Sequence, residues 1–189
     1  MTRIRMLNEE ELTPAQAAAC AEAIQGRRGK VPVPMIAWLR NPELASRIQK
    51  LGELLRFETS LNPAMVEMAI LICARHWTAH VEWKVHKELA LKAGLDPRVV
   101  ESIAAHREPV LNDETARVIY ELASNLLKKG RVPDELYATA VAKLGERGVA
   151  ELISILGYYT LVSFTLNTFE LGLPERAAIE LHDLDFPGQ

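Results

Sequence analysis

A single carboxylate stands inside an otherwise apolar stretch of the chain. Glu67 is the only polar residue among positions 64–74, which read Ala-Met-Val-Glu-Met-Ala-Ile-Leu-Ile-Cys-Ala. Burying a lone ionised carboxylate costs several kcal/mol, so such a group is either protonated or supplied with a partner. Glu82 and His86 follow the stretch and are the obvious partners. The three side chains together indicate proton-transfer chemistry.

Glu82 and His86 are predicted to lie on one face of a helix. Residues four apart are neighbours on a helix surface, so the two side chains can meet. A neighbouring carboxylate raises the pKa of an imidazole, whereas burial lowers it. The alternative is an ordinary pair on the helix surface, which would contribute a few tenths of a kcal/mol to stability. The buried position of Glu67 favours the functional interpretation.

Metal binding is a competing interpretation of the same residues. Glu82, His86 and Glu67 supply three oxygen and nitrogen ligands of the kind that Zn²⁺ or Fe²⁺ accepts. The pattern lacks the second closely spaced histidine that is typical of helix-borne zinc sites. We therefore predict a site without a metal and without another cofactor.

The spacing resembles that of the carboxymuconolactone decarboxylase family, which includes the AhpD-like alkylhydroperoxidases. Members with peroxidase activity carry a Glu, a Cys-x-x-Cys that begins twelve residues later, and a His four residues after the second Cys. Counted from Glu67, the cysteine positions hold Ala79 and Glu82, and the histidine is His86. The resemblance covers roughly residues 50–125. Within it Glu67 and His86 match the family pattern, while both thiols are absent.

The resemblance implies an all-α, AhpD-like fold and a homo-oligomer, commonly a trimer or a hexamer. It also implies a cofactor-free enzyme that acts on a small carboxylated or lactone substrate, by decarboxylation or a related lyase or isomerase step. His86 would then donate or accept the proton, Glu82 would orient it, and Glu67 would hold the network together or share its proton.

Two other functions stay open at this point. An AhpD-like hydroperoxide reductase needs a thiolate and a resolving thiol, and we predict no such activity because both motif cysteines are absent. A non-catalytic helical oligomer that binds a small molecule or a partner is the third hypothesis. Convergence of the three polar residues on one pocket would favour an enzyme.

Three further residues are predicted to bind substrate. Arg75 directly follows the apolar stretch and is suited to a substrate carboxylate or to the buried glutamate, although a surface arginine at a helix end fits equally well. Trp83 fits a core position better than a stacking position. His80 lies about 120° around the helix from His86, which places it at most on the rim of the same pocket.

The composition is that of an ordinary globular protein. The 189 residues are 49% apolar and 25% charged, and we predict a single domain, 1–189, with residues 1–40 as an N-terminal arm. A net charge of −3 without a long basic run argues against nucleic acid or an anionic membrane as a partner. Cys20 and Cys73 are predicted to be reduced, and the N-terminus carries no apolar signal region, so we expect a cytoplasmic protein.

The same cap-and-proline pattern predicts four helix starts, because the cap accepts a first-turn N–H and proline suits the first helical position. These starts are Thr13-Pro14, Asn41-Pro42, Asn62-Pro63 and Asp96-Pro97. The expected helices are 14–25, 42–56, 63–76, 79–93, 97–105, 113–129, 134–144 and 148–171, with no strand.

Two segments invite other interpretations. The basic, Gly/Pro-rich segment 26–34 has no P-loop pattern and is predicted to be a surface loop. The segment 149–171 is apolar enough to suggest a membrane span, but charged and polar residues interrupt it. We predict a core or subunit-interface helix there.

Overall fold

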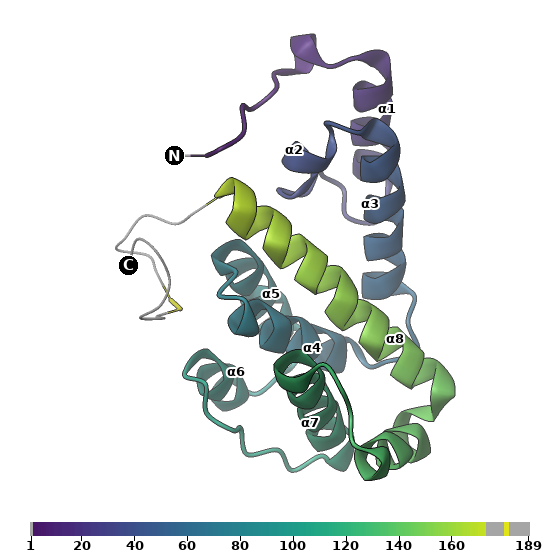
Figure 1. Ribbon diagram of the computed structural model, residues 1–189, viewed down its shortest axis with the longest axis vertical. Coiled ribbons are helices and arrows are strands. Elements are labelled where there is room, and N and C mark those ends of the chain that lie inside the picture. Colours follow the sequence, from purple (N-terminus) through teal and green to yellow (C-terminus); the bar gives the residue numbers. More distant parts are fainter. Residues whose placement is uncertain (1, 173–179, 182–189) are drawn as a thin grey trace.

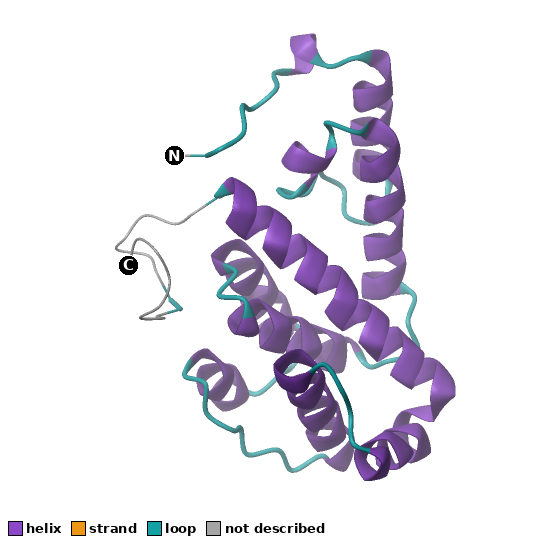
Figure 2. Ribbon diagram, in the orientation of Figure 1, coloured by secondary structure: helices purple, strands orange, loops and turns teal. Residues whose placement is uncertain are grey.

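The computed structural model describes residues 2–172 and 180–181, and its regular elements are all helical, as Figures 1 and 2 show. This confirms the predicted all-α class. After a 3₁₀ turn at Glu9–Glu11, the α-helices are α1 (Pro14–Gln25), α2 (Met35–Trp38), α3 (Pro42–Phe57), α4 (Pro63–His76), α5 (His80–Lys92), α6 (Pro97–Ala104), α7 (Glu114–Lys129) and α8 (Asp134–Phe169).

Helix α4 is the centre of the fold. The Asn62 side chain accepts a hydrogen bond from the backbone N–H of Ala64 at 2.9 Å, and Pro63 follows in the first turn, as the sequence predicts. The helix is buried almost all round, which is what an apolar stretch without a polar face requires. It contacts α5, α6, α7 and α8, so a side chain on α4 is reached from several elements.

Helix α5 returns alongside α4 after a turn of three residues, 77–79. Thr78 adopts a left-handed φ of 47°, which reverses the chain within this short connection. The buried face of α5 carries His80, Glu82, Trp83 and His86. The short turn therefore aims the polar residues of α5 at α4.

The last element, α8, contains the two helices predicted for 134–144 and 148–171, joined at a break. Gly145, at φ 70° and ψ 166°, interrupts the helical backbone between them. Of the described helices, α8 alone has the length and hydropathy of a possible membrane span, and 56% of that apolar window is buried inside the fold. The second half of α8 crosses the molecule diagonally in Figure 1 and contacts α4 and α3.

The N-terminal part contains a short helix that was not predicted from the sequence. Helix α2 has only four residues, too few for a periodic pattern, and follows the Pro-rich loop. Its Met35 and Trp38 side chains are buried, and the Trp38 indole donates a hydrogen bond to the Thr165 hydroxyl of α8 at 3.0 Å. Part of the predicted arm therefore belongs to the core.

We predict that Gly145→Ala lowers the free energy of unfolding by about 1 kcal/mol or more, because a side chain disfavours this backbone conformation. Glu146→Ala is the matched control, since Glu146 is exposed and helical and should change stability by less than about 0.5 kcal/mol. Urea denaturation followed by circular dichroism measures both. Equal effects of the two substitutions would contradict the assigned break.

Candidate active site

The imidazole of His86 lies between two carboxylates. Its Nδ1 is 2.6 Å from Oε2 of Glu67, and its Nε2 is 3.0 Å from Oε2 of Glu82. All three residues are buried, with Glu67 on α4 and the other two on successive turns of α5. The residues that the sequence singles out for proton transfer thus form one hydrogen-bonded chain.

The two carboxylates decide the charge of His86. Burial alone would lower the pKa of His86, but the hydrogen bonds from the imidazole to Glu67 and Glu82, with the charges of both groups, raise this pKa above its ordinary value. An imidazolium donates from both ring nitrogens and has no lone pair for a metal ion. Among the described residues, no group of three acidic, histidine or cysteine side chains is arranged to hold a metal.

Helix α8 packs against another side of the hydrogen-bonded residues Glu67, His86 and Glu82. The ring of Tyr159 meets the His86 imidazole edge-on, with centroids 5.0 Å apart and an angle of 82° between the planes. Tyr158 packs against Tyr159 in the same manner at 5.2 Å. Burial raises the pKa of both phenols, so both are neutral and can donate hydrogen bonds.

A cavity of about 190 Å³ opens beside Glu82 and His86. Glu67 does not line it and lies on the far side of the imidazole. The chain of hydrogen bonds therefore runs from a buried end at Glu67 to a cavity end at Glu82. The other lining residues are Arg28, Lys30, Val31, Pro32, Val33, Pro34, Trp38, Arg56, Val81, Val85, Tyr158, Tyr159 and Val162.

The cavity has a cationic wall. The Nε atoms of Arg28 and Arg56 are buried and have no hydrogen-bond partner among the described residues. A Cβ atom on Gly52 would come within 2.3 Å of the Arg28 Nη2 atom and 2.0 Å of the Tyr158 hydroxyl, so this close approach needs glycine. A buried N–H without an acceptor is costly, and an anionic ligand would relieve that cost.

This wall was not predicted from the sequence. Segment 26–34 was predicted to be a surface loop, but residues 28 and 30–34 line the cavity. Arg56 and Tyr158 come from α3 and α8, so no local pattern shows that they meet. The available signal was the pair of adjacent tyrosines inside the apolar segment 149–171.

The residues predicted to bind substrate lie elsewhere. Arg75 is buried, and its guanidinium donates to the Ala104 carbonyl at 2.8 Å and to the Thr78 hydroxyl at 3.1 Å. Trp83 is buried and donates to the Glu180 carboxylate at 3.3 Å. His80 is buried at the start of α5. None of Arg75, Trp83 and His80 is among the residues that line the cavity at Glu82.

The two cysteines are not poised for thiol chemistry. Burial raises the pKa of Cys73 to about 12, so its thiol stays protonated at neutral pH. Its sulfur lies 3.5 Å from the Thr160 hydroxyl, on α8. Burial also raises the pKa of Cys20, which is half-buried on α1. Neither cysteine lines the cavity at Glu82.

Solved structures of other proteins have a similar fold. An uncharacterized peroxidase-related protein from Silicibacter sp. TM1040 superposes with a TM-score of 0.73 over 93% of each chain, at 14% sequence identity. A variant of the debrominase Bmp8 in complex with 2,3,4-tribromopyrrole superposes with a TM-score of 0.72 over 92% of each chain, at 12% identity. The chain has the predicted AhpD-like fold. No family model matches it, and no curated protein does.

We predict that His86 titrates above its ordinary pKa of about 6.5, and that Glu67→Gln lowers this pKa, because one of the two groups that raise it is lost while burial remains. A histidine whose pKa is raised on folding stabilises the protein below its unfolded pKa, and this contribution disappears as pH rises through the folded pKa. The wild type should therefore lose this stability above about pH 6.5.

NMR of the imidazole C–H signals measures these titrations. His76 is the internal reference, since burial and then the nearby His106 and Lys128 lower its pKa. Its titration should be the same in wild type and in Glu67→Gln. An unchanged His86 titration in Glu67→Gln would show that the carboxylate does not control the imidazole.

Proposed function

We propose that this protein is a cofactor-free acid–base enzyme that acts on a small carboxylated or lactone substrate, by decarboxylation or a related lyase or isomerase step. The observation that carries the proposal is the buried Glu67–His86–Glu82 chain, which ends at a cavity with a cationic wall. An ordinary surface pair of Glu82 and His86 would be exposed and would lack the second carboxylate, Glu67.

The geometry favours other roles for Glu67, Glu82 and His86 than those predicted from the sequence. Both nitrogens of His86 already face carboxylates, so we assign the transfer to and from substrate to Glu82. His86 restores the proton of Glu82 through its Nε2, and Glu67 holds the imidazole and stabilises its charge. Glu82 was predicted only to orient His86, and here it is the group at the cavity end.

These groups can carry out a decarboxylation. The bond between the substrate carbon and its carboxylate breaks, and the electron pair moves into a conjugated carbonyl as CO₂ leaves. Glu82 then protonates the carbon, and one proton from solvent restores the chain. The valine- and proline-rich walls lower the local dielectric, which favours conversion of a carboxylate to neutral CO₂. Arg28, Lys30 and Arg56 are the groups that would hold a carboxylate or a lactone carbonyl.

The similar structures agree with an enzyme but not with one reaction class. One is described as peroxidase-related and the other as a debrominase with a bound halogenated pyrrole. A small planar ligand in that debrominase is consistent with a cavity of about 190 Å³ beside Tyr159 here. The hydroperoxide reductase alternative would need thiol chemistry from Cys73, whose pKa of about 12 works against it.

We predict that Glu82→Gln lowers kcat by about 10² or more while substrate still binds, because the amide keeps the shape and loses the transferable proton. Glu67→Gln and His86→Asn should each cost a similar factor. Combining those two should be no worse than the more damaging one, since residues that act as a unit are non-additive. Incubation in D₂O with a panel of β-keto, unsaturated and lactone carboxylates, followed by NMR, reports CO₂ loss and deuterium uptake.

Arg56→Ala is the matched variant for binding and should raise KM more than it lowers kcat. Full activity of Glu82→Gln on a substrate of the wild type would refute the assigned role. Consumption of an organic hydroperoxide with a dithiol, abolished by Cys73→Ser, would establish the reductase instead. Tight binding of panel members without any turnover would favour the non-catalytic helical oligomer.

We also propose that the protein is a homo-oligomer, a trimer or a hexamer. Ile153, Leu161 and Phe164 follow one face of α8 and are 43%, 41% and 48% exposed. Such an apolar stripe is suited to a subunit interface. Leu161→Glu should therefore shift the mass measured by light scattering toward the monomer, while Leu51→Glu, at a residue 47% exposed on α3, should not. A monomeric wild type at micromolar concentration would contradict this.

A further inference from the structure

The hydroxyl of Tyr158 is a polar group of the cavity at Glu82 that has no part in the Glu67–His86–Glu82 chain. Tyr158 is buried on α8 and lines this cavity. Its oxygen accepts a hydrogen bond from Nη2 of Arg28 at 3.4 Å, so its own O–H remains available as a donor. Within the described part of the chain, Tyr158 is not the donor of any hydrogen bond. A nearby cation polarises such an O–H and makes it a stronger donor.

Helix α3 makes room for this hydroxyl and its cation. Gly52 lies inside α3, where glycine costs about 1 kcal/mol relative to alanine. A Cβ atom on Gly52 would overlap both the Tyr158 hydroxyl and the Arg28 guanidinium. The Tyr158 ring also packs edge-on against Tyr159, whose ring meets His86 in the same manner. Contacts with α3, α8 and the loop that carries Arg28 therefore fix the position of the hydroxyl.

The charges around Tyr158 keep its phenol neutral. Burial raises the pKa of Tyr158, while the charge of Arg28 and its hydrogen bond lower it, and smaller effects come from Glu82, which raises it, and Arg56, which lowers it. The pKa stays above its ordinary value of about 10, so the phenol keeps its proton at neutral pH. The charge of Glu82 thus reaches the hydroxyl. Since Glu82 and Tyr158 both line the cavity, a small ligand can contact the two groups at different points.

We propose that Tyr158 and Arg28 form an oxyanion-binding pair, in which the Tyr158 O–H donates to the substrate carbonyl oxygen that becomes negatively charged. This role rests on the acid–base function proposed above. When the bond to the carboxylate breaks and CO₂ leaves, the electron pair moves toward this oxygen and forms an enolate. Glu82 then protonates the carbon and the carbonyl forms again, while Tyr158 keeps its proton throughout. The pair therefore favours 3-oxo carboxylates, which leave an enolate, over saturated carboxylates.

Binding of 4-nitrophenolate to the full chain tests the pair without any turnover. This phenolate is small and planar, carries negative charge on an oxygen as an enolate does, and is followed by its absorbance. The wild type should bind it, and Tyr158→Phe should weaken binding about tenfold or more, because a hydrogen bond to a charged oxygen is lost. Arg28→Gln should weaken it by a similar factor. 4-Nitrotoluene, in which a methyl group replaces this oxygen, should bind equally to wild type and Tyr158→Phe.

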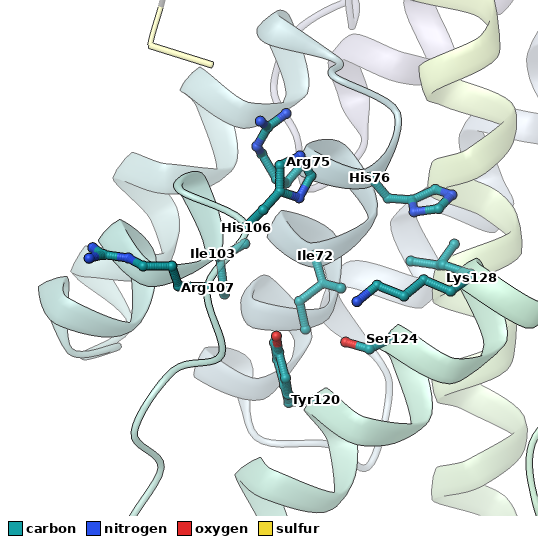
Figure 3. Close-up of a pocket in the computed structure, with 10 residues that line it drawn as sticks. Ile72, Arg75, His76, Ile103, His106, Arg107, Tyr120, Ser124 and Lys128 are labelled. Carbon is teal, nitrogen blue, oxygen red and sulfur yellow. The ribbon is translucent and has the colours of Figure 1, made fainter. Parts of the chain in front are cut away.

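Tyr120→Phe is the matched control. Tyr120 is half-buried on α7, interacts through its hydroxyl with Ser124, and lines a separate cavity of about 50 Å³ at the end of α4, which Figure 3 shows. This variant should leave phenolate binding unchanged. On any substrate of the wild type, Tyr158→Phe should lower kcat by about 10² or more with little change in KM, as for other oxyanion donors, and Tyr120→Phe should change neither.

The outcomes separate this pair from the proposed reaction. No phenolate binding by the wild type, undiminished binding by Tyr158→Phe, or equal weakening by Tyr120→Phe would overturn the pair. Equal loss of 4-nitrotoluene binding in Tyr158→Phe would also overturn it, because the effect would then concern the shape of the cavity. Phenolate binding that depends on Tyr158, without turnover of any carboxylate, would support the pair and count against the proposed reaction alone.

Discussion

The buried carboxylate of Glu67 is the constraint on which the arrangement of this molecule depends. An apolar helix can hold such a group only when a partner reaches it, and His86 does so at 2.6 Å. The imidazole must come from an element that lies against α4, and the three-residue turn before α5 supplies that element. A second carboxylate, Glu82, then faces the other ring nitrogen. The burial of Glu67, the pairing of α4 with α5 and the protonation of His86 therefore depend on one another.

The surroundings convert this buried chain into a site with two unlike sides. Tyr159 packs edge-on against the imidazole, while Arg28 and Arg56 bring positive charge to the cavity that His86 and Glu82 line. The N-terminal loop lines the same cavity through residues 28 and 30–34, so its Pro-rich segment is part of the site. A small anion in this cavity would lie next to Glu82 and away from Glu67, so protons would be exchanged with a ligand at the Glu82 end of the hydrogen-bonded chain.

Most of the fold follows from local sequence signals, and the central chain follows from spacing. Cap residues followed by proline place the starts of four α-helices at the observed residues, because both effects act within one turn. The meeting of Glu67, Glu82 and His86 could be anticipated from one buried position and a four-residue interval. Arg75 could not be placed, since its guanidinium donates to the carbonyl of Ala104, a contact that only tertiary structure creates. The same holds for Arg56 and Tyr158.

Because the turn at 77–79 is short, the contacts of Glu67 with the α5 side chains are unusually sensitive to changes in its length. One inserted residue there would displace α5 relative to α4, and Glu82 and His86 would no longer meet Glu67 in the same geometry. Surface loops elsewhere, such as the connection between α6 and α7, can absorb insertions without such a displacement. Lineages descended from a common ancestor of this protein should therefore vary in loop length around the molecule while the interval between Glu67 and His86 stays fixed.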